Sequence, residues 1–78
     1  MELTKKLQVK KHCLMPGQTI NAVIKKFNLQ DVQENEMKIL LDNFKLFNNH
    51  PIFKPGMEVF VPILERHYSK VFTYPENQ

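Results

Sequence analysis

The fold of this chain is decided by two short stretches, Met15–Ile20 (MPGQTI) and Phe53–Pro62 (FKPGMEVFVP), each built around a Pro-Gly pair. These pairs hold the only two glycines of the 78 residues. Proline presets the backbone φ, and the glycine after it can take a positive φ, so each pair predicts a tight corner. An apolar series at helical spacing follows the first corner, and a β-branched and aromatic run follows the second. The expected order is therefore strand, corner, helix, helix, corner, strand.

The first corner leads into a helix that extends from Thr19 to about Asn28. Thr19 suits the N-cap position because its hydroxyl can accept a hydrogen bond from a free amide of the first turn. Four apolar side chains then recur at positions i, i+3, i+4 and i+7, namely Ile20, Val23, Ile24 and Phe27. This spacing places them in one stripe, so the sequence predicts an amphipathic helix.

A second helix is indicated by a further apolar series at the same spacing, formed by Met37, Leu40, Leu41 and Phe44. Its start stays open between two positions: Asp31 with Glu34 as a capping box, or Asn35 as a later cap. Acidic residues near either start favour a helix N-terminus through the helix dipole. We expect the helix to end at Asn43 and Lys45–Lys54, which is rich in asparagine, to form a loop.

The outer segments predict two strands, Leu7–Met15 and Met57–Ile63. Pro62, near the end of the second strand, suits the edge or the terminus of a sheet. The first strand alternates imperfectly between apolar and polar residues. We therefore expect either a bulge or a change of buried face between Val9 and Leu14.

In this order and spacing, about residues 8 to 63 resemble the LysM domain, a small βααβ module. The resemblance is carried by the corners, the helix stripes and the closing strand: Pro16–Ile20, Val23–Ile24, Phe27, Leu40–Leu41, Asn43, Asn48–Asn49, Lys54–Gly56 and Val59–Pro62. It implies an α+β fold in which two helices pack on a two-stranded antiparallel sheet. It also implies that Leu14 points into the core with His12 on the same face. Gln18 departs from the family pattern, which has an acid there.

The LysM resemblance also implies a ligand groove. Members of the family that bind N-acetylglucosamine polymers hold them between the loop before the first helix and the loop after the second helix. By position, one wall would be Gly17, Gln18, Thr19 and Ile20, and the other Asn49, His50, Pro51 and Ile52. A purely structural interpretation makes Gly17 and Thr19 a turn and a cap and places Ile52 in the core. Gln18 and His50 are the two side chains that the fold does not obviously require.

Two arms are predicted to flank the LysM-like domain, a basic one at residues 1–7 and an aromatic one at residues 64–78. In the C-terminal arm Tyr68, Lys70, Phe72 and Tyr74 recur at period two, which is typical of an extended segment. Exposed aromatic residues are costly in water, so this arm either folds back on the domain or adds to the sheet of a partner. Both alternatives stay open at this point.

The length, the charge distribution and the single cysteine limit which classes of protein fit the chain. The chain is long enough for one small domain with a thin core. Residues 1–30 hold six lysines against one acid, and residues 31–78 hold five basic residues against seven acidic ones, an ordinary asymmetry. The single cysteine, Cys13, cannot form an internal disulfide, and we interpret it as a small buried hydrophobic residue. The first 15 residues lack the apolar segment of a secretory signal or a membrane span, so neither export nor a membrane is expected.

No pattern of catalytic chemistry stands out. His12 and Cys13 are adjacent in a predicted strand and so point to opposite faces, and the sequence has no paired metal-ligand spacing. The lysines are not interleaved with aromatic residues, which makes nucleic-acid binding a minor alternative. We expect neither an enzyme, nor a metal, nor a cofactor.

Two functions known for LysM-like modules fit the chain: a structural adaptor in a virion or contractile tail, in its tube or baseplate, and a peptidoglycan- or chitin-binding module. The arms and Gln18 favour the adaptor, which would assemble in the host cytoplasm, be located in the virion and bind neighbouring structural proteins. The alternative implies a location in the cell wall.

Overall fold

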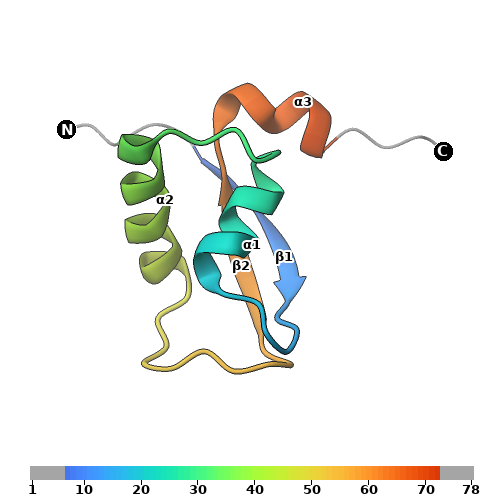
Figure 1. Cartoon of the computed structure of the whole chain (residues 1–78), viewed down its shortest axis with the longest axis vertical. Helices are drawn as coiled ribbons and strands as arrows, with labels where there is room; N and C mark the ends of the chain where they lie inside the picture. Colours follow the sequence, from blue (N-terminus) through green and yellow to red (C-terminus); the bar gives the residue numbers. More distant parts are fainter. Residues whose placement is uncertain (1–6, 73–78) are drawn as a thin grey trace, which may run out of the picture.

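The computed structural model describes residues 7–72, and these form a two-stranded sheet with helices on one face (Figure 1). The elements follow in the order β1 (Gln8–Cys13), α1 (Ile20–Phe27), α2 (Glu34–Phe47), β2 (Glu58–Ile63), a 3₁₀ turn η1 (Glu65–His67) and α3 (Tyr68–Val71). The predicted α+β class and βααβ layout are confirmed. Residues 1–6 of the predicted basic arm, and Tyr74, lie outside the described residues.

The sheet pairs β1 with β2 antiparallel, with Gln8 opposite Ile63 and Cys13 opposite Glu58. The register is unbroken across these six pairs, so neither the bulge nor the change of face predicted within this strand is present. The even-numbered residues of β1 face the helices, and the buried Leu14 continues that face, as the resemblance implies. Val9 points to the outer face and is 39% exposed.

The first helix agrees with its prediction. Thr19 is the N-cap, and its hydroxyl accepts a hydrogen bond from the Ala22 amide at 3.1 Å. Val23 and Ile24 are buried between the helix and the sheet, and Asn28 is the C-cap. The Thr19 and Asn28 caps account for the two ends of the helix, and the apolar stripe accounts for its buried face.

The second helix differs from its prediction at both ends. It starts after Gln33, because the Glu36 side chain accepts the Gln33 amide at 2.9 Å in a capping box; both predicted starts are wrong. It continues four residues past Asn43 to Phe47, so the expected end and the start of the expected loop are wrong as well. The side-chain amide of Asn43 donates to the Ile39 carbonyl at 2.8 Å within the helix, whereas Asn48, the residue that caps it, also bonds to β2.

Two buried asparagines, each at the C-terminus of a helix, close the outer edge of β2. Asn28 donates to the carbonyls of Ile24 at 2.9 Å and Pro62 at 3.1 Å and accepts the Leu64 amide at 2.8 Å. Asn48 repeats the arrangement by bonding to Phe44 in its own helix and to both backbone groups of Phe60.

These contacts give the edge of β2 hydrogen-bond partners without a further strand, since each carboxamide offers a donor and an acceptor as a peptide group does. They also explain how Pro62 fits inside a strand. Phe60 and Leu64, two residues before and after Pro62, direct their amides to this edge, so the nitrogen of Pro62 faces it too. That nitrogen has no hydrogen to donate, and at Pro62 Asn28 supplies only a donor, to the carbonyl.

The core lies between the two long helices and the inner face of the sheet. Its buried apolar members are Leu14, Val23, Ile24, Leu40, Phe44, Val59, Val61 and Leu64. The two corners meet beside it, because the Leu14 amide donates to Met57 at 2.9 Å and the Gly56 amide donates to Leu14 at 2.7 Å. Gly17 and Gly56 have φ values of +85° and +92°, a conformation that other residues rarely adopt, so both corners need glycine.

The segment after β2 is helical where it was predicted to be extended. Residues 65–71 form η1 and α3, which lie at one end of the sheet (Figure 1). Helical geometry brings Tyr68 and Phe72 together at i and i+4, with ring centroids 6.1 Å apart. The period of two was misleading because four residues at alternate positions are too few to distinguish a strand from a helix of about one turn.

Candidate functional site

A shallow hollow of about 260 Å³ lies between the two corners. One side is formed by Gly17, Gln18, Thr19 and Ile20, with Leu14 and Met15 beside them. These are the four residues predicted for the first wall of the groove. The opposite side is Phe53, Lys54 and Pro55.

The predicted second wall does not line this hollow. Asn49, His50, Pro51 and Ile52 are all exposed, and the ring of His50 packs edge-on against Phe53 at 6.0 Å between centroids. Ile52 is 62% exposed, so its interpretation as a core residue is wrong. Because α2 extends to Phe47, the loop is shorter than expected, and Phe53 is its apolar residue that packs against the core.

Gln18 has a structural role that sequence reasoning missed. Its Oε1 accepts the Met15 amide at 2.9 Å and lies 2.9 Å from Nε2 of His12. His12 is half-buried, and its ring contacts Phe27 of α1 at 5.1 Å between centroids. Gln18 therefore links the first corner, through the Met15 amide, to His12 on the inner face of the sheet. The sequence signal for this role is a glutamine in a predicted turn, because its side chain can accept a hydrogen bond from the backbone amide three residues earlier.

Cys13 is exposed at the end of β1, so its interpretation as a buried residue is wrong. It belongs to the odd-numbered face of the strand, which the helices do not cover. Within residues 7–72, no group of three or more histidine, cysteine or acidic side chains could hold a metal ion. In the same part of the chain, no helix combines the length and the apolar character needed to cross a bilayer.

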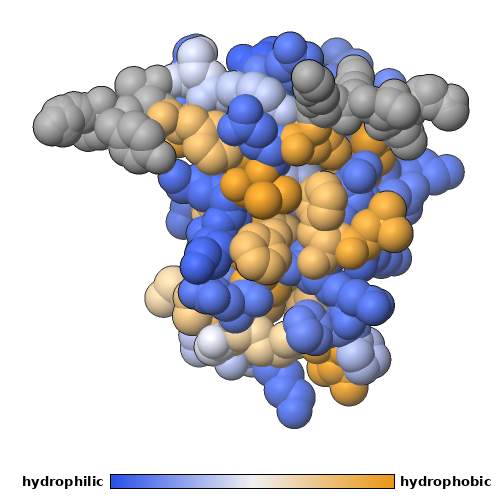
Figure 2. Space-filling view, turned by 180° about the vertical axis from the view of Figure 1, so that it is seen from behind, coloured by the Kyte–Doolittle hydropathy of each residue, from blue (hydrophilic) through white to orange (hydrophobic). Residues whose placement is uncertain are grey.

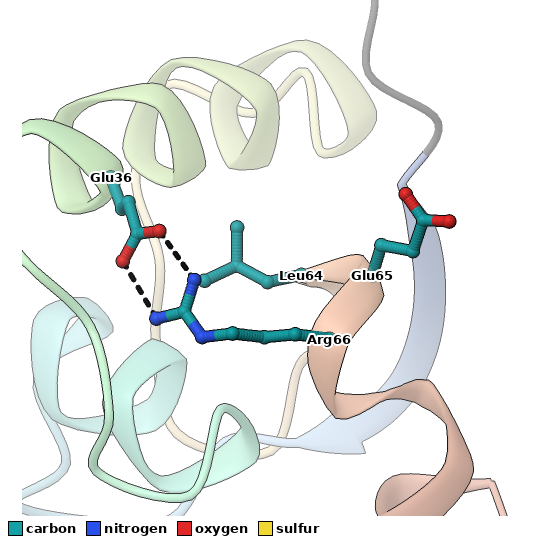
Figure 3. A pocket seen from close by; sticks show the side chains of 4 residues that line it. All are labelled: Glu36, Leu64, Glu65 and Arg66. Atoms are coloured by element: carbon teal, nitrogen blue, oxygen red, sulfur yellow. Dashed lines mark hydrogen bonds and ion pairs between the residues drawn. The ribbon is translucent and has the colours of Figure 1, made fainter.

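A second hollow, of about 440 Å³, lies at the opposite end of the fold and is closed by an ion-pair cluster (Figure 3). Arg66, the one arginine of the chain, reaches from η1 to the start of α2, and its two terminal nitrogens bond to the carboxylate of Glu36. It also bonds to the Asp31 side chain at 3.3 Å and the Asp31 carbonyl at 2.7 Å. Glu65 is directed away from this cluster in Figure 3.

This cluster fastens the C-terminal segment to the connection between α1 and α2. His67 is buried, and its Nε2 lies 3.1 Å from the carbonyl of Asp31. The connection needs support because Leu29 and Gln30 both have positive φ values, near +59° and +57°. Because Asp31 and Glu36 both bond to the Arg66 guanidinium, its positive charge is already engaged within the fold, and we interpret the cluster as structural.

The same cluster makes stability depend on pH. Hydrogen bonds from Arg66, and then from the Gln33 amide, lower the pKa of Glu36 from 4.5 to about 2. A pKa that is lower in the folded state means stability that is full above about pH 5 and lost as pH falls toward 2. Because the Arg66 side chain is 42% exposed, solvent screening limits the contribution of this pair to about 1 kcal/mol at most.

We expect Glu36→Gln to remove this part of the pH dependence. Glutamine still accepts the Gln33 amide, as either residue can in a capping box, but carries no charge for Arg66. Urea unfolding at pH 6, 4 and 3 should show that the wild-type chain loses about 1 kcal/mol more than the variant over this range. Equal losses in the two proteins would show that the ion pair contributes nothing measurable.

No family model matches the chain, and neither do the curated proteins or the solved structures that were compared with it.

Proposed function

We propose that the protein is a non-enzymatic structural adaptor of a virion or contractile tail, in its tube or baseplate, which binds neighbouring subunits through its LysM-like core and its terminal segments. The observation that carries this proposal is the amount of large apolar surface left in solvent. The exposed side chains are Val9, Met15, Leu29, Leu46, Phe47, Ile52 and Phe60. Hydrophobic colour gathers over the middle of the back face in Figure 2. Apolar residues that gather in a patch, as on this back face, are typical of protein-binding sites.

The proposed location in a virion or contractile tail rests on the LysM resemblance, which is an analogy of fold. The C-terminal segment adds a physical argument. Tyr68 and Phe72 present a pair of rings at the end of the fold, and Lys10 of β1 lies 5.4 Å from the Phe72 ring centroid. Tyr68 is half-buried, and burial raises the pKa of its hydroxyl. Clustered aromatic residues are frequent anchors in protein interfaces.

Replacing Tyr68, Phe72 and Tyr74 by serine tests this proposal. We expect the variant to remain folded, because the core recorded for residues 7–72 includes neither Tyr68 nor Phe72, and its incorporation into the assembly to fall at least tenfold. The measurement is the fraction of tagged chain that co-sediments with particles when the neighbouring structural proteins are co-expressed. Ser69→Ala, an exposed change in the same segment, is the matched control. Normal incorporation of a folded triple variant would overturn the role of this segment.

The hollow between the corners supports a second candidate, binding of peptidoglycan or chitin. Its first wall holds the four residues that the family resemblance implies, although its second wall is different. Under the adaptor proposal we expect no pelleting of the chain with insoluble peptidoglycan or chitin that resists high salt.

Salt-resistant pelleting would instead support the glycan-binding candidate. In that case Lys54→Ala, at the hollow, should weaken it, while His50→Ala and Lys45→Ala, which do not line the hollow, should leave it unchanged.

A further inference from the structure

The two outer edges of the sheet are treated differently. The edge of β2 is closed by Asn28 and Asn48, which bond to the backbone of Phe60, Pro62 and Leu64. The alternate residues of β2, Val59, Val61 and Ile63, therefore turn their backbone groups toward β1, where they face His12, Lys10 and Gln8.

It follows that Val9, Lys11 and Cys13 direct their amides and carbonyls to the opposite edge. Within residues 7–72, the hydrogen bonds recorded for this structure include no backbone or side-chain partner for these groups at that edge. In Figure 1, β1 borders the sheet with no described helix or strand beyond it.

We propose that this edge of β1 receives an extended, acidic segment of a neighbouring protein as a third strand. An open strand edge binds extended chains by backbone hydrogen bonds, and the alternate side chains select among them. The outer face of β1 offers Val9, Lys11 and Cys13 in that order, so the segment carries an apolar residue beside Val9 and a carboxylate beside Lys11. In β2 the residue opposite Lys11 is Phe60, which supplies no negative charge.

Charge favours an acidic partner over a second copy of this chain. A symmetric antiparallel pair of β1 strands centred on Lys11 places Lys11 opposite itself, and one centred on Lys10 does the same for Lys10. Like charges directly opposite one another destabilise a strand pair, and lysines on an edge are a common protection against self-association. Lys10 lies over the Phe72 ring, so Lys11, exposed on the outer face, is the cation that a carboxylate meets.

The partner's identity as a protein rests on the proposed function, but the test of the edge does not involve the assembly. The probe is a seven-residue peptide of alternating valine and glutamate, titrated into the isotopically labelled chain and followed by NMR. We expect the amides of Val9, Lys11 and Cys13 to shift and to gain protection from exchange. The amides of Lys10 and His12, already bonded to β2, should change little. A matched peptide of valine and lysine should bind at least tenfold more weakly.

Two variants separate the edge from the fold. Lys11→Pro removes an amide that faces the open edge and no hydrogen bond to β2, as Pro62 does in the other strand, so it should keep the thermal unfolding midpoint within a few degrees and abolish peptide binding. Lys11→Glu should bind the lysine peptide and reject the glutamate peptide.

Unchanged amides at Val9, Lys11 and Cys13, or undiminished binding by a folded Lys11→Pro variant, would overturn the proposal. Equal binding of the two peptides would overturn its acidic selectivity. None of these outcomes alters the result of the C-terminal serine variant, so the two proposals fail separately.

Discussion

Replacing Asn28 by alanine is expected to destabilise the domain by about 3 kcal/mol, because three hydrogen bonds are lost in a fully buried position. The Leu64 amide and the Pro62 carbonyl would be left buried without a partner, and this desolvation is the larger part of the cost. A domain of this size has a thin core and little excess stability, so the loss should unfold a measurable fraction of the protein. Urea unfolding with far-UV circular dichroism measures it.

Asn43→Ala is the matched control for this prediction. Asn43 makes the same bond to the carbonyl four residues earlier, at 2.8 Å, but no bond to the sheet is recorded for it. We expect it to cost less than about 1 kcal/mol, since only one half-buried hydrogen bond is lost. Similar losses for Asn28→Ala and Asn43→Ala would show that the contact with β2 contributes little.

Phe44→Ala is expected to cost about 3–5 kcal/mol, the usual range for removing a buried aromatic ring. Phe44 is 1% exposed, lies in the core cluster and contacts the Phe53 ring at 5.2 Å between centroids. The change removes one of the largest fully buried side chains and leaves a cavity that the two helices cannot fill without moving. Thermal and urea unfolding should both show a marked loss, and the variant is expected to be partly unfolded at 37 °C.

Leu46→Ala, two residues further along α2, tests whether burial is the cause. Leu46 is 76% exposed, so its truncation should change the free energy of unfolding by no more than about 0.5 kcal/mol. Comparable losses at Phe44 and Leu46 would contradict the placement of the helix face. The Leu46→Ala variant also bears on the proposed adaptor function. If it is stable but is incorporated poorly into the assembly, part of the proposed interface with neighbouring subunits lies on α2.

The elements predicted best were those whose signals are local. The stripe of Ile20, Val23, Ile24 and Phe27, with Thr19 as its cap, predicted α1 closely, because spacing and capping act within a few residues. The two Pro-Gly corners were likewise apparent, since a positive φ is a requirement of the backbone itself.

The errors occurred where local signals compete. Asparagine favours helix ends, so Asn43 predicts the end of α2, but the helix continues through Leu46 and Phe47, and Asn48 is the residue that bonds to the sheet. The period of two in Tyr68, Lys70, Phe72 and Tyr74 predicts an extended tail, but η1 and α3 are helical. Its first turn is held instead by Arg66, which bonds to Glu36 and Asp31, 30 and 35 residues earlier in the sequence.

From the order of residues alone, the class of fold, the number of long helices and the corners could be derived, because each depends on periodicity or on the backbone preferences of proline and glycine. The residues of one wall of the hollow were implied by the resemblance to the LysM domain. The packed fold was needed to learn that Gln18 supports the first corner, that Cys13 is exposed and that Phe53–Pro55 form the other wall. It also revealed that one sheet edge is closed by Asn28 and Asn48 while the other carries Lys11. These features depend on which distant groups satisfy each buried donor and acceptor, and that pairing is settled only when the chain closes on itself.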